Sequence, residues 1–413
     1  MRKAIAAIAA LLFIGGALVL TPAAFCEEPA VGTKIGPDNW KQYEKYIPQS
    51  LSEQITRGQM TFEVGGDATK FVQPSSGYKR ATEQNKGKAK IDANGAMTGW
   101  EAGRPFPDID PKDPMAGFKI AYNLERRYEG DDQSLQAYQL INVDSKGQER
   151  YVTGTEYGWM WLSIKGRVDC EPLGEWAPNP KQIWRYNTLA IDFPYDIKGT
   201  SRLLIRYLDS AKDDDIWMYI PTMRRIRRMS GAQRQNNFVG TVCTYDDIRT
   251  FQGRPMEYDW KLIGEDRVLC AALDGKTPHP KNEKGFWIEP RSMRDCWIVE
   301  AVPRDKNYVY TKRLFWIDKE CFVPWHENVF DVQGRTWKVC ENYNAPIFMG
   351  EKADGELVVY EQSFIWLDLL DNTHTLLEYV GWDKDGKQTG KISTGQTREW
   401  YTIENIAKRG RRN

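Results

Sequence analysis

Hydrophobic and polar positions alternate with a period of two along much of the chain, which is the spacing of side chains on one face of a β-strand. β-Branched and aromatic residues are frequent in these stretches, and they suit a pleated surface. So many strands in one chain predict a sheet that curls or closes on itself. Strands are predicted in "GWMWLSIKG", "SRLLIRYLDS", "YVYTKRLFWIDKE", "FVPWHENVFDVQGRTWKVCENY" and "ELVVYEQSFIWLDLL".

Turn-forming residues separate several of these strands. "DSKG" (144–147) is predicted to close a hairpin within "YQLINVDSKGQERYVTG", and "DVQG" (331–334) and "DKDG" (383–386) are read as further hairpin turns. Helical patterns are few. They occur at 38–58, where a proline interrupts the pattern, and at 397–410 near the end of the chain.

No linker divides the chain into independent domains. The polar stretches 74–96 and 272–285 are predicted to be loops. The predicted fold class is mainly β: a large curved antiparallel sheet with a few helices. We expect a signal peptide over 1–26, an N-terminal extension with helices and loops over 27–130, and the curved sheet over 131–413, with 27–413 forming one compact unit.

The first 26 residues have the layout of a secretory signal peptide. Basic Arg2 and Lys3 precede an uncharged run from Ala4 to Leu20, which is short for a membrane-spanning helix. Cleavage after Cys26 predicts an exported, periplasmic protein. Lipid anchoring at Cys26 is the weaker alternative, because bulky Phe25 stands where a small residue is needed.

The composition is that of a globular protein without a strong overall charge. Lys plus Arg and Asp plus Glu number 57 each, so any attraction to nucleic acid or an anionic surface has to be local, and no nucleic-acid partner is expected. The 16 Trp and 20 Tyr suit pleated surfaces and the mouths of apolar pockets. Six cysteines follow the signal segment, as structural thiols or as disulfides whose pairing is not given by their spacing: Cys170, Cys243, Cys270, Cys296, Cys321 and Cys340.

Residue types that carry catalysis or bind metals are scarce. The three histidines, His279, His326 and His374, are far apart in the sequence, which disfavours metallohydrolase and Ser–His chemistry. Cys321 and His326 are five positions apart, and such residues face opposite sides of a strand. The sequence has no phosphate-cradling loop, nucleophile elbow or dinucleotide fingerprint. We therefore predict a protein that is not an enzyme and has no cofactor or metal.

The stretch "DDDIWMYIPTMRRIRRMSG" (213–231) couples an apolar strand to a block of arginines. On the strand, Ile216, Met218 and Ile220 share one face, and Trp217 and Tyr219 share the other. Both faces are apolar. The strand is therefore predicted to be covered on both sides.

Two interpretations of the arginine block remain open. If Pro221 and Thr222 form a tight turn, Asp215 lies opposite Arg228 and Ile216 opposite Arg227, and the acidic run forms cross-strand charge pairs of ~0.2–1 kcal/mol each.

Alternatively, alternation places Arg224 and Arg228 on one side of the strand and Arg225 and Arg227 on the other, so that one pair faces solvent or the aspartates and the other pair lies on the covered side. There an unpaired guanidinium is costly, and an acidic headgroup entering beside the strand would supply the partner. The predicted ligand-binding residues are Trp217, Met218, Tyr219, Arg224, Arg225, Arg227 and Arg228.

A family resemblance rests on this stretch and on four others. Trp217, Tyr219 and Pro221, followed by a basic strand, occur together with "GRPFPDIDPKDPMAGFKIAYN", "GTVCTYDDI", "YTKRLFWIDKE" and "ENVFDVQGRTWKV". From about residue 30 to its end, the chain resembles a family of exported Gram-negative proteins, domain-of-unknown-function family 1329, with the fold of the LolA-like lipoprotein-localisation carriers.

The resemblance implies a half-open antiparallel β-barrel around an apolar groove, with helices that act as a lid. In carriers of this fold the groove accepts acyl chains during transfer between membranes. The resemblance also implies work alongside an inner-membrane exporter of the resistance-nodulation-division type and an outer-membrane protein. This chain is about twice as long as the small carriers, and its N-terminal region could fill or extend the groove.

Three functional hypotheses follow. The first is a periplasmic carrier or chaperone for a lipid-like or otherwise hydrophobic molecule. The second is a non-enzymatic scaffold or adaptor of an envelope assembly, whose barrel is filled by its own side chains. The third and weakest is an enzyme acting on lipid-like substrates, which would need a cluster of polar residues facing into the groove.

Overall fold

The computed structural model describes residues 27–135, 138–154, 159–272, 281–283, 286, 288, 290–348, 356–378 and 390–412. Within these residues the protein is mainly β, with two large, predominantly antiparallel sheets and a few helices, as predicted. The expected signal peptide over 1–26 and the turn predicted at 383–386 lie outside the described residues. No helix in the described part of the chain is long and apolar enough to cross a membrane.

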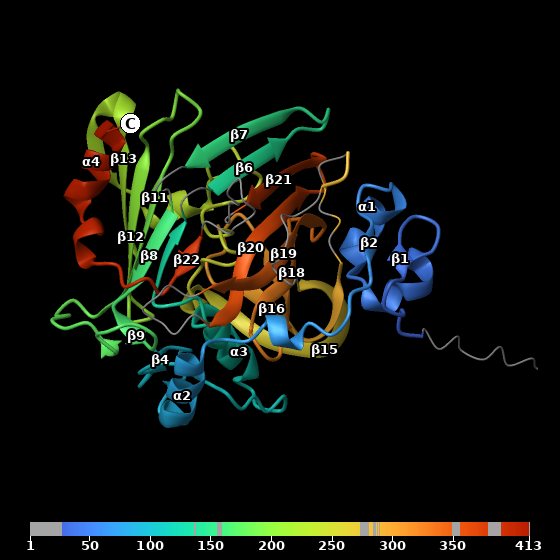
Figure 1. Cartoon of the computed structure of the whole chain (residues 1–413), viewed down its shortest axis with the longest axis horizontal. Helices are drawn as coiled ribbons and strands as arrows, with labels where there is room; N and C mark the ends of the chain where they lie inside the picture. The colour runs from blue at the N-terminus through green and yellow to red at the C-terminus, as the bar shows by residue number, and fades with distance from the viewer. Residues whose placement is uncertain are drawn as a thin grey trace, which may run out of the picture.

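The first large sheet has seven strands and stands at the left of Figure 1. One face of this sheet is covered by the C-terminal helix α4 (Ile403–Arg412). The other face is directed at the second sheet. In spatial order its strands are β14 (Arg225–Arg228), β13 (Asp215–Ile220), β12 (Ser201–Tyr207), β11 (Ile183–Ala190), β8 (Trp159–Ser163), β5 (Asp132–Leu135) and β22 (Lys391–Ile392).

The second large sheet has nine strands and is strongly curved. The end of its first strand pairs in parallel with β19, at Ala271 opposite Tyr343, which brings the two ends of the β15–β19 run together. In spatial order its strands are β15 (Tyr258–Ala272), β16 (Ser292–Pro303), β17 (Lys312–Asp318), β18 (Pro324–Phe330), β19 (Thr336–Phe348), β20 (Leu357–Asp368), β21 (Thr373–Glu378), β6 (Tyr138–Val143) and β7 (Glu149–Gly154).

The predicted hairpins at 144–147 and 331–334 are confirmed. Asp144 Oδ1 accepts hydrogen bonds from the backbone N–H groups of Lys146 and Gln148, and Gly147 takes a positive φ between β6 and β7. Asp331 Oδ1 accepts in the same way from the N–H groups of Gln333 and Arg335 between β18 and β19. In both turns a side-chain carboxylate satisfies backbone groups that the strands leave unpaired.

The N-terminal region packs on the nine-stranded sheet, at the right of Figure 1. The pattern predicted as helix at 38–58 contains two short 3₁₀ segments, Trp40–Tyr46 and Gln49–Leu51, followed by α1 (Ser52–Thr56). Leu51 and Ile55 are buried against that sheet. Two-stranded sheets in this and the following regions are β1 (Lys34–Ile35) with β2 (Phe62–Glu63), β3 (Lys90–Ile91) with β4 (Met97–Thr98), and β9 (Lys165–Arg167) with β10 (Gly174–Glu175).

The loop predicted over 74–96 is wrong, because α2 (Ser76–Asn85) occupies much of it. The side chain of Ser75 caps this helix by accepting a hydrogen bond from the Tyr78 N–H. Tyr78, Ala81 and Thr82, at the i, i+3 and i+4 spacing, form its buried face. The serine cap and this spacing are visible in the sequence, but the high polarity of the segment hides them.

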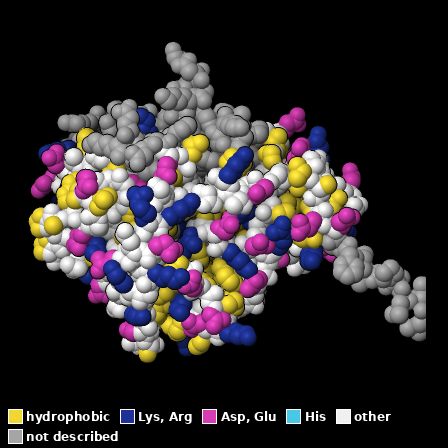
Figure 2. Space-filling model, turned by 60° about the horizontal axis from the view of Figure 1, so that its bottom comes forward, with side chains coloured by type: hydrophobic (Ala, Val, Ile, Leu, Met, Phe, Trp, Pro, Cys, Tyr) yellow, Lys and Arg dark blue, Asp and Glu magenta, His cyan; other side chains and the backbone are white. Residues whose placement is uncertain are grey.

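Two segments of the chain run through the interior of the protein. Helix α3 (Ala116–Glu125) packs on β15, and the connection that follows it, residues 126–131, leads into β5 between the two sheets. The interior segment, residues 241–257, also lies between them: Arg206 on β12 donates to the Gln252 carbonyl, and Arg313 on β17 donates to the Thr250 carbonyl. Figure 2 shows acidic and basic side chains mixed over one face of the molecule, in keeping with the balanced charge.

Candidate functional site

The predicted ligand-binding strand exists, but its hairpin has a different register. The chain turns through a 3₁₀ segment, Pro221–Met223, and Arg224 takes a left-handed conformation. Trp217 therefore lies opposite Arg228 and Met218 opposite Arg227, a shift of two residues from the predicted pairing. A two-residue turn fails because proline fixes a negative φ, whereas tight hairpin turns require a positive one.

Trp217 and Tyr219 face the C-terminal helix rather than an open groove. They belong to the apolar cluster beneath α4, with Ile406, and Tyr219 is buried. On the opposite face of β13, Ile216 is buried and Met218 is half-buried. The strand is thus packed by the protein's own side chains, which is a structural role.

The arginines of this hairpin are exposed. Arg224, Arg225, Arg227 and Arg228 all lie at the surface. The expectation that one pair is buried on a covered side is wrong, because β14 is the edge strand of its sheet and leaves long side chains free to reach water. Arg228 forms an ion pair with Asp215, so the charge-pair interpretation holds for that residue, although the register differs.

A second group of arginines lines a cavity. These residues come from the α3–β5 connection, from β11 and from the interior segment: Arg126, Arg127, Arg185 and Arg249. The cavity has two adjoining parts, of about 40 and about 10 Å³, and Arg127, Tyr128 and Glu129 line both. Its smaller part lies between the two sheets, and its larger part lies between the seven-stranded sheet, the α3–β5 connection and residues near Tyr78 and Trp100. At the ~10–15 Å³ that one water needs, the larger part has room for about three waters.

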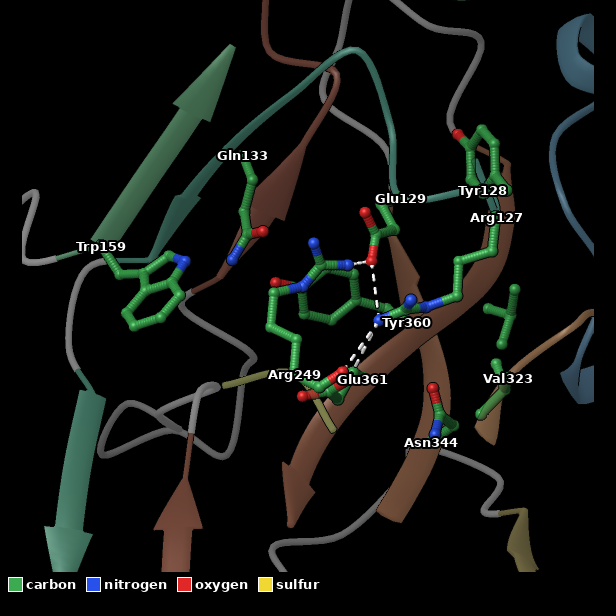
Figure 3. Close-up of a pocket in the computed structure, with 11 residues that line it drawn as sticks. Arg127, Tyr128, Glu129, Gln133, Trp159, Arg249, Val323, Asn344, Tyr360 and Glu361 are labelled. Carbon is green, nitrogen blue, oxygen red and sulfur yellow. Dashed lines mark hydrogen bonds and ion pairs between the residues drawn. The ribbon is translucent and has the colours of Figure 1, made fainter. Parts of the chain in front are cut away.

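Glu129 is the central acceptor of the smaller part (Figure 3). Its carboxylate lies 3.1 Å from Arg127 and 3.2 Å from Arg185, and it also contacts Arg249. Arg127 reaches further to Glu361 on β20, at 3.6 Å. One carboxylate is therefore shared by three guanidinium groups, and this network joins the two sheets.

Tryptophan rings frame the larger part. The Arg126 guanidinium carbon lies 3.3 Å from the centre of the Trp184 ring and 4.6 Å from that of Trp100. Arg185 lies over Trp184 at 4.2 Å and over Trp161 at 5.4 Å. Flat guanidinium groups stack well on aromatic faces, and burial strengthens the attraction.

The positive charges in the cavity are incompletely balanced. Burial lowers the pKa of Arg126 to about 10, with Glu125 opposing the shift. Burial also lowers the pKa of Arg185 well below its usual value, and nearby Arg206 adds to this effect. Desolvation disfavours the charged form of each group, and the neighbouring carboxylates do not fully offset it.

Two buried aspartates tie the cavity wall to distant parts of the chain. Asp131 accepts hydrogen bonds from the backbone N–H groups of 168–170, and Asp169 accepts them from the hydroxyls of Ser75, Tyr128 and Ser393. Burial, reinforced by the neighbouring Asp169 charge, raises the pKa of Asp131 to about 6. These carboxylates hold the wall in place.

One contact resembles a hydrolase triad and has a structural explanation. Ser50 Oγ lies 2.9 Å from His326 Nε2, and Glu341 contacts His326 Nδ1. However, Nε2 also lies 2.8 Å from Asn328 Oδ1, so this nitrogen is shared between Ser50 and an amide side chain. The arrangement anchors the N-terminal region to β18, and no contact between His326 and Cys321 is present among the described side-chain bonds.

The six cysteines are free thiols, and all are buried. Burial raises the pKa of the Cys170 and Cys243 thiols to about 12, so these side chains behave as small apolar groups. Within the described residues, no group of three or more His, Cys, Asp or Glu side chains is arranged to hold a metal ion.

Sequence reasoning missed the cavity residues. Arg126 and Arg127 follow a helix, where basic residues are usual, and Arg185 and Arg249 stand alone in the sequence. They meet only because the α3–β5 connection and the interior segment run between the sheets. The one available signal is an aromatic residue next to Arg in "WRY" (184–186) and in "ERRY" (125–128), and it is weak.

Comparison with known proteins identifies relatives. A family model described as "Protein of unknown function (DUF1329)" matches residues 34–406. An uncharacterized protein of Pseudomonas aeruginosa is 22% identical over 290 residues, which cover 64% of this chain and 58% of that protein, so the match spans little more than half of the relative's length.

Two solved structures are also similar. A DUF1329 family protein from Desulfovibrio piger is 17% identical, with 72% of this chain and 99% of that chain covered and a TM-score of 0.48. A LolA superfamily protein from Nitrosomonas europaea is 16% identical, with 68% and 93% covered and a TM-score of 0.39. At these TM-scores we base no argument on either structure.

Proposed function

This chain belongs to the DUF1329 family, and from that premise we propose that it is a periplasmic, non-enzymatic carrier of a lipid-like or otherwise hydrophobic molecule. The observation that carries the proposal is the larger part of the cavity, whose walls combine tryptophan and tyrosine rings with arginine and carboxylate groups. Aromatic walls with a few converging polar groups suit a bound amphiphile.

The cavity as it stands is smaller than an acyl chain. Its about 40 Å³ accommodates a head group, so a loaded carrier has to be wider than the structure described above. The interior segment borders the smaller part through Arg249. Polar contacts and buried apolar side chains such as Ile248 and Phe251 both hold it in place, so widening the cavity on that side has to break both kinds of contact.

A scaffold with a filled interior is the second candidate. The same interior segment favours it, since buried residues such as Asp247 and Arg249 fill the space between the sheets with ion pairs. A scaffold would retain no hydrophobic molecule through gentle purification. The two candidates therefore differ in a measurable quantity.

The exposed arginines of β14 are proposed as a docking surface rather than a ligand site. Arg225 and Arg227 lie on an open edge, away from the residues that line the cavity. The family resemblance suggests an acidic surface on an inner-membrane exporter of the resistance-nodulation-division type, or on an outer-membrane protein, as the partner. Charge complementarity of this kind mainly governs the association rate and its dependence on salt.

Mass spectrometry of an organic extract tests the carrier directly. The mature protein is purified without detergent from its native periplasm, extracted, and compared with a parallel extract of an unrelated periplasmic protein. We expect one hydrophobic molecule in a molar ratio near one. A clean extract from folded protein would contradict the carrier and favour the scaffold.

A tryptophan variant links that cargo to the cavity. Trp100→Leu removes an aromatic wall beside Arg126 and Trp184, and we expect it to reduce the retained cargo severalfold. Trp400→Leu is the matched control, because Trp400 is exposed and lies outside the cavity lining. Equal cargo in both variants would place the binding site elsewhere.

A further inference from the structure

Arg126 is the least compensated charge in the cavity. Its side chain is only 3% exposed, yet neither Nε nor Nη1 has a hydrogen-bond partner among the described residues. Within the same residues its one ion pair is with Glu125, at 3.7 Å, and Glu125 also faces Arg206 at 3.5 Å. Burying a guanidinium whose N–H groups have no acceptor costs free energy, unless a bound ligand accepts hydrogen bonds from those groups.

Trp161 presents a second open donor to the same space. Its ring is 4% exposed, lines the larger part of the cavity, and carries an Nε1–H group without a partner. Buried indole N–H groups usually find an acceptor. Arg185 stacks on this ring, so a third positive group lies beside the two open donors.

The charge count points the same way. Lys165 also lines the larger part, but it is paired with Glu101 at 2.5 Å. Arg127 has Glu361 as well as Glu129, and Arg185 shares Glu129 with Arg249. Asp131 is already bonded to three backbone N–H groups. Arg126 faces only the carboxylate of Glu125, which also faces Arg206, so among the described residues it is the cavity arginine with the weakest pairing.

We propose that the larger part of this cavity binds a phosphate-type oxyanion, with Arg126 and Trp161 as its donors and Arg185 as its neighbouring charge. The anion is carried either free or as the head group of a lipid. This inference rests on the proposed function only for the lipid form, since free phosphate binding needs no carrier.

The size and chemistry of the site favour an oxyanion. A cavity with room for about three waters holds one tetrahedral anion but no larger polar group. Planar guanidinium groups bind such anions through parallel N–H bonds, and the enclosing tryptophan rings exclude competing water. The β14 arginines, which first suggested an acidic head group, lack this enclosure.

Ligand-dependent unfolding of the full mature chain tests the site. The unfolding temperature and the heat of binding are measured with inorganic phosphate, with dihexanoyl phosphatidic acid below its micelle concentration, and with dihexanoylglycerol, at constant ionic strength set by chloride. We expect the first two to stabilise the protein and the neutral diacylglycerol to have no effect. A tenfold or greater preference for the phosphatidic acid identifies a lipid head group; equal affinity identifies free phosphate.

Variants separate this site from binding at the surface. Arg126→Met should weaken phosphate binding by about tenfold or more, because it removes charge-assisted hydrogen bonds. It should also raise the unfolding temperature of the ligand-free protein, since an unpaired buried charge is replaced by an apolar chain of similar length. Trp161→Phe removes one donor and should weaken binding severalfold, and Arg126→Lys should restore it in part.

Two results would overturn the inference. The first is an equal response of the wild type and Arg126→Met to phosphate, which would place the anion at the surface. The second is no response of the wild type to either phosphate compound. A neutral hydrophobic molecule in the organic extract, without any response to phosphate, refutes the anion site and supports the carrier. A response to phosphate together with an empty extract supports the anion site and contradicts the carrier.

Discussion

The β14 hairpin and the cavity each gather four arginines, and the two groups differ in their surroundings. Arg224, Arg225, Arg227 and Arg228 are exposed, and their one ion pair within the described residues joins Arg228 to Asp215. The cavity arginines are buried, and Arg126, Arg185 and Arg249 lie over tryptophan rings. The same residue type thus lies in water in one place and in the interior of the protein in the other.

The difference shows where charge has consequences. A guanidinium in water interacts weakly with its neighbours because solvent and salt screen it, so the β14 block can only act through another molecule. A buried guanidinium acts on the protein itself, through desolvation and through the partner it lacks. The predictions below test that contrast, beginning with a buried arginine that does have its carboxylates.

The largest effect is expected at Arg313, which is fully buried between Glu327 and Asp247. Arg313→Met leaves both carboxylates without this cation and should lower the free energy of unfolding by about 3–5 kcal/mol. Urea denaturation followed by tryptophan fluorescence measures the loss. Arg126→Met, which leaves no comparable acid unpaired, is the matched comparison; a similar loss there would mean that the cavity arginines are compensated after all.

The sequence predicts the β strands well and the cavity poorly, for one physical reason. A strand is indicated locally, because a short run of apolar, β-branched and aromatic residues is enough to predict it, as in β12 and β20. The hairpin turns are local too, and Asp144 and Asp331 identify them. No short stretch of the sequence indicates the cavity, because its residues come from four separate segments: Arg126, Trp161, Arg185 and Arg249.

Local prominence also misled the choice of site. A run such as "RRIRR" is conspicuous in a sequence because its residues are adjacent, but adjacent residues on an edge strand are easily solvated. Helix α2 shows the converse. Its buried face of Tyr78, Ala81 and Thr82 is real but lies within a polar stretch, where tertiary packing overrides composition.

Tyr219 tests whether the predicted strand acts in packing or in binding. Tyr219 is 3% exposed beneath α4, so Tyr219→Ala should lower the free energy of unfolding by about 3 kcal/mol through lost burial and a residual cavity. The cargo retained per folded molecule should not change. Loss of cargo without a change in the free energy of unfolding would show that β13 contacts the ligand.

The cavity wall should make stability depend on pH. Burial and Asp169 raise the pKa of Asp131 to about 6, above the ordinary value of an aspartate, so the folded protein binds this proton more tightly than the unfolded chain. The contribution is fully present below about pH 4 and is lost as the pH rises through about 6, with a magnitude of the order of 2–3 kcal/mol. Urea titrations at several pH values should show it.

His374 acts in the opposite direction over the same range, and a variant separates the two. Burial lowers the pKa of His374 to about 4, so its contribution is lost as the pH falls below about 6. Asp131→Asn removes only the aspartate contribution. The difference in unfolding free energy between the wild type and Asp131→Asn should therefore shift in favour of the wild type as the pH falls from 6 to 4; a difference independent of pH would contradict the raised pKa.

The smallest effect on stability is expected at β14. Arg225→Glu with Arg227→Glu reverses two exposed charges that have no described partner, and it should change the free energy of unfolding by less than ~0.5 kcal/mol. If the hairpin docks on an acidic partner, the same variant should slow delivery of cargo to acceptor membranes at low salt, and the difference from the wild type should shrink as salt screens the charges. Arg304→Glu, also on the surface but paired with Asp259, is the control for a general charge effect. Cargo lost before any partner is added would instead connect the hairpin to the cavity, and the contrast between the two arginine groups would then fail.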